Sequence, residues 1–596
     1  MTGPFQKFFM LNRFRLFVFL LGAALTFCGC GGGGGGNSSG TLNAVADWSQ
    51  FSQPISGNSM QWTLFTPDEI FVQSIAINRD NPGDQSAQIT GLDKGLYHLR
   101  VELFSNRDLS GSLVGVLDEL IAITNSTTYR AAVGEAPASV KVTPANATFK
   151  ANEGKQFYVA LYDAAGEATF AAPGSFTWAT FGGVATVDAE GFVQGQSAGS
   201  GTVVATHVPS GLQGGATLTI QSTNVTTGKW TILVYMNAAN DLYQFSDFNV
   251  NQMEQVAGNP DVRFVVQWKQ STDLFSDSTF NGTRRYLVKP DNTGEIASEL
   301  VQNMGLGVDM GDKSTLLQFI NWGKTFYPAQ RYCLVIWNHG NGWRRGPERQ
   351  DPTRAVSYDD QTGNSIQTWE LAQALGSNHF DILAWDASLM QMIEVADEVQ
   401  DNADYIVGSE ESPPGKGYPY HLVFDDFRDN PDDTTLNLSK SFVDAMVQFY
   451  QNDGTAKVTQ SVIDTNEIPN LVSQIDNLGD ELSTNSAALT SIIQNVRANA
   501  KSYSPTGGRV YRDLWDVCDR IQSQTGIVSV QNACAATKAA IEAAVKWEGH
   551  KASSDGSHGI SIDFSSAVQF APVATDYGNL RFSNETSWNE WLAVAP

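Results

Sequence analysis

Apolar and polar positions follow one pattern in the first part of the chain and another in the rest. Residues 41–130 and 136–222 contain short stretches in which the two kinds of residue alternate, such as GLYHLRVELFS, with Asn, Gly and Asp between them. Alternation of this kind is typical of strands that bury one face. We therefore predict two all-β domains of sandwich type over these ranges.

From Lys229 onward the apolar stretches become continuous, and helical patterns separate them. WTILVYMN, VRFVVQW, YCLVIW, FDILAWDA, YIVGSEES and GISIDF are short runs rich in β-branched and aromatic residues, and stretches such as SLMQMIEVADEVQ lie between them. Continuous apolar strands between helices indicate a mostly parallel sheet that is covered on both faces. We predict one such α/β domain over residues 229–596.

The N-terminal segment predicts export. The apolar run LFVFLLGAALTF follows basic residues and precedes CGCGGGGGG. It is shorter than a membrane span of about 20 residues and is typical of a signal peptide. Cys30 follows a small residue, as the lipidation site of a bacterial lipoprotein does; the alternative is an ordinary cleaved signal with incidental cysteines. We predict a lipoprotein signal peptide over 1–29, a flexible tether over 30–40, and an extracytoplasmic protein of the cell envelope or surface that is attached to the membrane by lipid alone.

The net charge of the chain limits the kinds of partner that it can bind. Its 596 residues include 63 acidic and 37 basic side chains, which give a net charge of −26. An acidic surface repels phosphate groups, so nucleic acid and anionic membrane surfaces are disfavoured. The sequence also lacks a phosphate-binding glycine loop, an HExxH motif and a CxxC pair. We predict no nucleic-acid partner.

Three cysteines lie beyond the N-terminal segment. Cys333 stands inside the apolar stretch YCLVIW and is predicted to be a core residue. Cys518 and Cys534 lie on neighbouring helical stretches, which makes them candidates for a disulfide in an oxidising compartment. Two separate buried thiols explain the same pattern equally well.

Two polar motifs end predicted strands. IWNHGNGWR places His339 after one strand, and AWDASLM places Ser388 after a later one. Sheets of this kind hold their sites at the carboxyl ends of the strands. If the two strands are neighbours, the imidazole and the hydroxyl face each other across one cleft.

These motifs carry a resemblance to the clostripain family of cysteine peptidases (peptidase family C11), which has a caspase-like α/β/α sandwich. WTILVYMNAANDL is similar to the family's opening strand and turn, NHGNGW to its histidine motif, and DASLMQMIEVADEVQDNADYIVGSEES to its nucleophile motif; GKGYPY and GISIDF also fit. Residues 136–222, with Trp178 and VATVDAEGFVQGQSAG, resemble a bacterial Ig-like domain of group 2, a module that serves as a spacer or adhesion unit.

The resemblance implies roles for three residues. His339 matches the catalytic histidine, the N–H of Gly340 would be an oxyanion donor, and Ser388 stands where the family has its nucleophilic cysteine. A serine hydroxyl must lose its proton to a base as it attacks, whereas a cysteine is already partly thiolate. Serine therefore needs a closely held histidine that a third group orients. The family works as a dyad, and its motifs place no orienting carboxylate.

Three interpretations of Ser388 follow. The leading one is a catalytically silent or strongly impaired peptidase homologue, a pseudoenzyme whose cleft binds peptides or proteins. The second is an active endopeptidase that uses Ser388 with His339. The third is an engineered Cys-to-Ser form of an active cysteine peptidase, although engineered proteins usually lack the signal peptide that this chain keeps. Cys333 cannot replace the nucleophile because it lies inside a strand.

Two further regions relate to processing and specificity. Family members are activated by cleavage after a basic residue between the two motifs, so the Arg354–Ala355 bond is the candidate here; a charged surface loop is the alternative. Members that cut after Arg or Lys hold an acid in the first pocket, which SEESPPGKGYPY should border. Glu410 and Glu411 are the acidic candidates for substrate binding. Pro419 stands where some relatives carry an acid, which argues against a basic preference.

No cofactor is predicted. Some family members use calcium, and the stretch DDFRDNPDD offers carboxylates for it. A solvated acidic loop explains the same stretch, so we predict no metal site.

Overall fold

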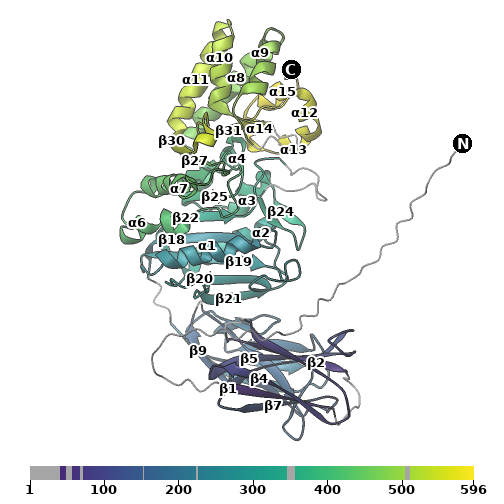
Figure 1. The fold of residues 1–596 in the computed structure, drawn as a ribbon. Helices are drawn as coiled ribbons and strands as arrows, with labels where there is room; N and C mark the ends of the chain where they lie inside the picture. Colours follow the sequence, from purple (N-terminus) through teal and green to yellow (C-terminus); the bar gives the residue numbers. More distant parts are fainter. Residues whose placement is uncertain are drawn as a thin grey trace, which may run out of the picture.

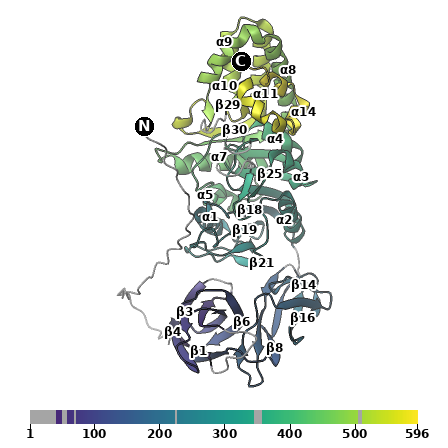
Figure 2. The same cartoon turned by 90° about the vertical axis from the view of Figure 1, so that its right-hand side faces the viewer.

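The protein is elongated, with a β-rich N-terminal part, a central α/β part and a helical C-terminal part along one axis (Figures 1 and 2). The structure, a computed structural model, describes residues 40–48, 57–67, 71–151, 153–222, 226–344, 356–503 and 510–596. The predicted signal peptide, Cys30 and Arg354 lie outside these residues.

The N-terminal part is built from strands, as the alternating pattern predicts. Burial alternates residue by residue along β1. The strands are β1 (Gly40–Asp47), β2 (Ser59–Phe65), β3 (Phe71–Asn78), β4 (Asp84–Leu92), β5 (Gly95–Phe104), β6 (Leu113–Ile123), β7 (Thr127–Ala132), β8 (Ser139–Thr143), β9 (Asn146–Lys150), β10 (Gly154–Gln156), β11 (Tyr158–Tyr162), β12 (Ala168–Thr169), β13 (Phe176–Phe181), β14 (Ala185–Val187), β15 (Phe192–Gly195), β16 (Gly199–His207) and β17 (Gln213–Gln221).

One sheet joins the two predicted β segments. Its order is β4-β1-β7-β12-β11-β8, and β7 pairs in parallel with β12 across the expected boundary. The core under this sheet also combines both segments, because Ala160 and Phe170 pack in the same cluster as Leu42 and Trp62. The two segments therefore bury part of their apolar surface against each other.

The central part contains a nine-stranded sheet of order β21-β20-β19-β18-β22-β25-β26-β27-β30. Its strands are β18 (Gly228–Asn237), β19 (Val262–Gln270), β20 (Gly282–Leu287), β21 (Glu299–Gly305), β22 (Ala329–Trp337), β25 (Phe380–Asp386), β26 (Ala403–Gly408), β27 (Thr459–Asp464) and β30 (Val545–His550). A separate hairpin, β23 (Val356–Asp359) with β24 (Asn364–Ile366), lies beside it.

The sheet is mixed, so the expectation of a mostly parallel sheet holds only for its centre. Strands β19, β18, β22, β25 and β26 run parallel to their neighbours in the centre. The outer pairs at both edges are antiparallel. At one edge the reason is connectivity, because β19, β20 and β21 follow one another in the chain and an antiparallel pair needs no crossover helix.

Helices cover both faces of this sheet, which explains the continuous apolar strands. Along β18, Leu233 and Tyr235 face one core and Val234 and Met236 face the other. The first core is covered by α2, α3 and α4, and the second by α1, α5 and α7. The helices are α1 (Tyr243–Val256), α2 (Lys313–Phe326), α3 (Leu371–Leu375), α4 (Ile393–Val399), α5 (Tyr420–Val423), α6 (Asp425–Asp429) and α7 (Thr435–Tyr450).

The C-terminal part adds helices and a small sheet next to α4. GISIDF forms β31 (Ser561–Asp563) as a strand, but this strand pairs with β29 (Tyr511–Asp513) in a three-stranded sheet with β28 (Ser502–Tyr503), outside the central sheet. The helices are α8 (Ile468–Thr484), α9 (Ser486–Asn499), α10 (Leu514–Gln524), α11 (Val528–Ala544), α12 (Ala567–Phe570), α13 (Ala574–Tyr577), α14 (Arg581–Glu585) and α15 (Trp588–Leu592).

The cysteines of the described residues are buried free thiols. Cys333 lies in β22, as predicted, and burial raises its pKa far above the usual value. Cys518 on α10 and Cys534 on α11 are also unbridged. Burial raises the pKa of the Cys518 thiol, and its hydrogen bond with Cys534 raises it further. The raised pKa values keep the thiols of Cys333 and Cys518 neutral and unreactive.

The order of the central strands determines where a site can form. The chain passes from β18 to β19 on one side and then returns to β22 on the other side of β18. Such a reversal leaves a crevice at the carboxyl ends of the strands that flank it. The loops after β18, β22 and β25 all meet at this edge.

Candidate active-site cleft

A cleft of about 190 Å³ lies at this edge of the sheet. His339 and Ser388 both line it, because β22 and β25 are neighbouring parallel strands. Its other lining residues are Leu242, Trp337, Asn338, Asp386, Ala387, Pro413, Pro414, Gly415 and Gly417. The prolines and glycines belong to the SEESPPGKGYPY loop, which forms one wall of the cleft.

Ser388 sits on a tight turn that the main chain holds in place. The N–H of Leu389 donates to the carbonyl of Glu411 at 3.1 Å, and the N–H of Gln391 donates to that of Ser409 at 3.2 Å. Leu389 adopts a φ of 65°. A non-glycine residue in this left-handed region costs about 1 kcal/mol or more and persists only where the surroundings enforce it. The turn therefore fixes Ser388 at the cleft by backbone contacts.

Gly340 allows the histidine loop to touch this turn. A Cβ on Gly340 would lie 2.3 Å from the carbonyl oxygen of Ser388 and 3.0 Å from its nitrogen. Only glycine can approach another main chain so closely. Gly340 also bridges to Val356 at the start of β23. The glycine is thus required for the geometry that brings His339 and Ser388 to one cleft.

The imidazole of His339 lies between a carboxylate and a tyrosine ring. Its Nε2 is 2.6 Å from Oδ1 of Asp241, and its ring stacks on Tyr358 with 5.8 Å between the ring centroids. Within the part of the chain that the structure describes, no hydrogen bond joins Ser388 Oγ to His339. The cleft thus combines an oriented histidine with a hydroxyl to which, among the described residues, it makes no hydrogen bond.

Asp386 places a carboxyl in the cleft, two residues before Ser388. It accepts hydrogen bonds from the N–H of Tyr418 at 3.0 Å and from the hydroxyl of Tyr420 at 2.9 Å. Burial raises the pKa of Asp386 to about 7, although these two hydrogen bonds act in the opposite direction. A buried carboxyl of this kind is poised to lose its proton when a cation approaches.

The acidic residues proposed from the sequence lie elsewhere. Glu410 is buried, its Oε2 accepts from the N–H of Gly559 at 3.2 Å, and burial together with Asp513 raises its pKa. Glu411 is also buried. Pro419 is buried at the start of α5. None of these predicted substrate-binding residues is among the residues that line the cleft.

Two carboxylates at the cleft were missed from the sequence as functional residues. Asp241 lies in the quoted stretch WTILVYMNAANDL, and Asp386 lies in AWDASLM. The signal for both was their position, since each follows or ends a strand that is predicted to reach the same sheet edge. Among the described residues, no group of three or more His, Cys, Asp or Glu side chains is placed to hold a metal ion.

A histidine and a hydroxyl at neighbouring strand ends, with backbone amides close by, form the arrangement of hydrolases that act through a nucleophile. The sequence model of the clostripain family, Peptidase_C11, matches residues 234–594, and that of the bacterial Ig-like domain (group 2) matches residues 136–220. The family's model spans more than half of the chain, which therefore belongs to the clostripain family. Both resemblances seen in the sequence are confirmed.

Individual relatives are distant. Clostripain of Hathewaya histolytica is 25% identical over 358 residues, which are 50% of this chain and 67% of that protein. An inactive zymogen of a C11 protease from Parabacteroides distasonis is similar with a TM-score of 0.48 and 20% identity, over 61% of this chain and 99% of that one. A secreted C11 cysteine protease from Bacteroides thetaiotaomicron, solved with an irreversible peptide inhibitor, has a TM-score of 0.45 and 21% identity, over 61% and 99%.

Proposed function

We propose that this protein is a clostripain-family homologue of the cell envelope that binds peptides or proteins in its cleft and hydrolyses them poorly or not at all. The observation that carries the proposal is the cleft that both His339 and Ser388 line. The resemblance of the motifs implies that Ser388 stands where the family has its nucleophilic cysteine, and that the catalytic histidine and the oxyanion glycine are kept as His339 and Gly340. In subtilisin, loss of the nucleophile lowers the rate by a factor of roughly 10⁶, which indicates how large the loss of activity can be.

The geometry at Ser388 supports the view that catalysis by this protein is weak or absent. A serine needs its proton removed in the same step in which Oγ attacks, so it requires a base within about 2.6–3.2 Å. A cysteine tolerates a looser contact because its thiolate exists before attack. The cleft provides an imidazole without a hydrogen bond to Ser388 in the described structure, which suits a thiolate better than a hydroxyl.

A second candidate is an active endopeptidase, and the contact between Asp241 and His339 favours it. In this reaction the Oγ–H proton of Ser388 moves to the free nitrogen of His339 as Oγ bonds to the scissile carbonyl carbon. The carbonyl electron pair moves to oxygen, and the N–H of Gly340 would stabilise that oxyanion. The proton then passes to the leaving amine, and water releases the acyl group.

Asp386 favours a cationic side chain in the substrate. Among the described residues that line the cleft, Asp386 alone has a carboxyl group. The groups that donate hydrogen bonds to it, the N–H of Tyr418 and the hydroxyl of Tyr420, are neutral. A lysine or arginine side chain that enters the cleft would pair with the ionised carboxylate. This assigns to Asp386 the role that the sequence suggested for Glu410 or Glu411.

Location and processing complete the proposal. We infer lipid attachment at Cys30 after removal of residues 1–29, in keeping with a relative that is described as secreted. None of the helices in the described part of the chain has the length and apolar character of a membrane span. The Arg354–Ala355 bond remains the candidate for processing, and β23 begins at Val356.

Hydrolysis of a mixed library of fluorogenic peptides tests the function. The purified protein would be compared with Ser388→Cys, His339→Ala and Ser388→Ala, with and without calcium. We expect a silent native protein and a Ser388→Cys variant that cleaves. Cleavage by the native protein that both alanine variants abolish would instead show a serine peptidase. Silence of every variant, together with no peptide binding by fluorescence anisotropy, would refute both functions.

A further inference from the structure

Asp241 and His339 form a pair across the crevice at the centre of the sheet. Asp241 follows β18 and His339 follows β22, and these two strands are hydrogen-bonded neighbours. Oδ1 of Asp241 lies 2.6 Å from Nε2 of His339, at a separation of 98 residues in the chain. A contact this short between a carboxylate and an imidazole orients the ring.

The loop that carries Asp241 is held rigidly from both ends. The buried amide of Asn240 donates to the carbonyl of Tyr358 at 2.8 Å, and its oxygen accepts from the N–H of Leu242 at 3.0 Å. The carbonyl of Ala239 accepts from the N–H of Asp360 at 2.9 Å. Asp241, which lies between these anchored residues, is therefore presented at a fixed position.

The loop of His339 is tied to the same elements. The amide of Asn338 donates to the carbonyl of Asn237 at 2.6 Å, and its oxygen accepts from the N–H of Tyr358 at 2.6 Å. The ring of Tyr358 stacks on the imidazole. One set of buried amides therefore fixes the carboxylate and the ring relative to each other.

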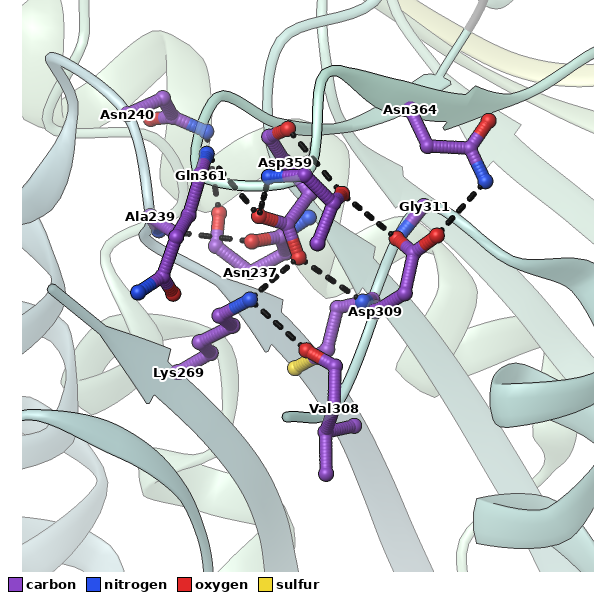
Figure 3. A network of polar contacts seen from close by, with 12 residues as sticks. Asn237, Ala239, Asn240, Lys269, Val308, Asp309, Gly311, Asp359, Gln361 and Asn364 are labelled. Carbon is purple, nitrogen blue, oxygen red and sulfur yellow. Dashed lines mark hydrogen bonds and ion pairs between the residues drawn. The ribbon is translucent and has the colours of Figure 1, made fainter. Parts of the chain in front are cut away.

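A buried ion pair supports this set from below, as Figure 3 shows. Nζ of Lys269 lies 2.7 Å from Oδ2 of Asp359, and both side chains are fully buried. Lys269 also donates to the carbonyl of Val308, and the same carboxylate oxygen accepts from the N–H of Met310. Asp359 ends β23, so the pair fixes the strand that carries Tyr358.

We propose that Asp241 is the positioning residue for His339, holding the neutral ring with its proton on Nε2 and its lone pair on Nδ1. The proton that leaves residue 388 then goes to Nδ1, and Asp241 stays ionised throughout. This inference rests on the proposed function, because it assigns to the cleft the third group that the family's dyad does not require. Such a group matters more for a serine than for a cysteine.

The solvent exposure of the Asp241–His339 pair determines how much kcat should fall when Asp241 is replaced. The side chain of Asp241 is 74% exposed and that of His339 is 35% exposed. In trypsin, where the corresponding carboxylate is buried, its replacement by asparagine costs about 10⁴ in kcat. Exposed ion pairs change an equilibrium by a factor of about 5 or less. We expect a decrease in kcat of about 10- to 100-fold, between these limits.

The first test measures the protonation of the two ring nitrogens of His339 directly and does not depend on enzymatic activity. The protein contains seven histidines. They would be labelled with ¹⁵N, and the signals of His339 identified from the His339→Ala variant, at a pH well above the usual histidine pKa of about 6.5. We expect a protonated-type Nε2 and an unprotonated-type Nδ1 in the native protein, and a mixed or reversed pattern in Asp241→Asn. Asp241→Glu should restore the native pattern.

A matched control is available in a second histidine–aspartate pair. His379 and Asp404 are 2.9 Å apart at an exposed position outside the cleft lining. Asp404→Asn should leave the His339 signals and the reactivity at position 388 unchanged. If Asp241→Asn also leaves the His339 ring signals unchanged, the proposal is wrong.

The second test measures chemistry in the Ser388→Cys variant. Alkylation of Cys at position 388 by iodoacetamide, located by mass spectrometry, and kcat and KM for peptides would be followed with and without Asp241→Asn. We expect a decrease in kcat with KM little changed, and partial recovery in Asp241→Glu. Changed ring signals without any hydrolysis would support the positioning role and refute the peptidase function. Hydrolysis by the Ser388→Cys variant that Asp241→Asn leaves unchanged, together with unchanged ring signals of His339, would refute the positioning role alone.

Discussion

The two sides of the cleft are built in different ways. On the histidine side, buried side chains hold the loops: the amides of Asn237, Asn240 and Asn338 bond to main-chain groups. In addition, Lys269 pairs with Asp359. On the nucleophile side, the turn is held by main-chain hydrogen bonds. A turn fixed by its backbone tolerates exchange of the side chain that it presents. The scaffold can therefore keep its shape whether residue 388 is serine or cysteine.

The largest effect should come from breaking the buried ion pair on the histidine side. Lys269→Met leaves the Asp359 carboxylate buried without its cation, and loss of one partner of a buried pair costs about 3–5 kcal/mol. Urea unfolding would measure this loss. Lys289, whose exposed pair with Glu299 spans 2.7 Å, provides the control, because Lys289→Met should cost less than about 1 kcal/mol. Equal costs for the two variants would contradict the role of the buried pair in holding the histidine side.

Next in size is the effect of Asp386 on the binding of basic peptides. The carboxyl is largely protonated below its pKa of about 7 and ionised above it, so affinity for an Arg- or Lys-containing peptide should rise as the pH passes through 7. Asp386→Asn should bind about 10- to 100-fold more weakly at about pH 8 and show no such rise, since hydrogen bonds to charged groups contribute about 1.5–3 kcal/mol.

Glu411→Gln tests the competing assignment. Glu411 lies outside the cleft lining, so this variant should keep the pH dependence of binding. Calorimetric titration with matched basic and neutral peptides would measure both. A pH dependence that disappears in Glu411→Gln and persists in Asp386→Asn would transfer the specificity role to Glu411.

Gly340 tests the contact between the two sides. In Gly340→Ala the new Cβ meets the main chain of Ser388, which cannot move without disturbing its turn. We expect a loss of about 1–3 kcal/mol in the free energy of unfolding, the range for overpacked sites. In the Ser388→Cys background, cleavage should fall as the loops separate.

Gly454 is the matched control for this substitution. A Cβ there has no heavy atom within 4 Å, so Gly454→Ala should be neutral or stabilise by about 0.4–1 kcal/mol. Thermal unfolding of both variants gives the comparison. If Gly340→Ala is as stable and as active as Gly454→Ala, the close approach of the loops is not required.

An effect that depends on pH should arise behind the nucleophile side, at Glu394 on α4. Burial of the side chain raises the pKa of Glu394 from 4.5 to about 8, and the nearby carboxylate of Asp563 makes a smaller contribution in the same direction. Between these values the native state holds a proton that the unfolded state has released, so this group lowers stability as the pH rises from 4.5 to 8. Glu394→Gln stays neutral and should gain up to about 5 kcal/mol over the native protein at about pH 8.5, relative to pH 4.5, because each pKa unit corresponds to about 1.4 kcal/mol.

The exposed residue Glu590 on α15 provides the comparison, because Glu590→Gln should show no such gain across this range. Denaturant midpoints at the two pH values measure both variants. A gain that is independent of pH would mean that Glu394 acts through packing and not through its proton.

Much of the fold follows from the sequence, because period and composition are local properties. The alternating stretches before residue 222 became strands, and WTILVYMN became β18 with its two faces in two cores. Placement of His339 and Ser388 at one cleft followed from the rule that parallel strands end at the same edge. The mixed character of the sheet did not follow, since a strand's pattern reports its burial and not the direction of its neighbour.

The tertiary structure alone decided which charged groups face the cleft. The sequence identifies Asp241, Asp386, Glu410 and Glu411 as acids, but only folding buries Glu410 against Asp513 and brings Asp241 to His339 across 98 residues. It also joined β7 to β12 across the boundary between the β segments. The physical reason is the same in each case. A residue's own pattern sets its secondary structure, whereas its partners come from long-range packing that no local pattern encodes.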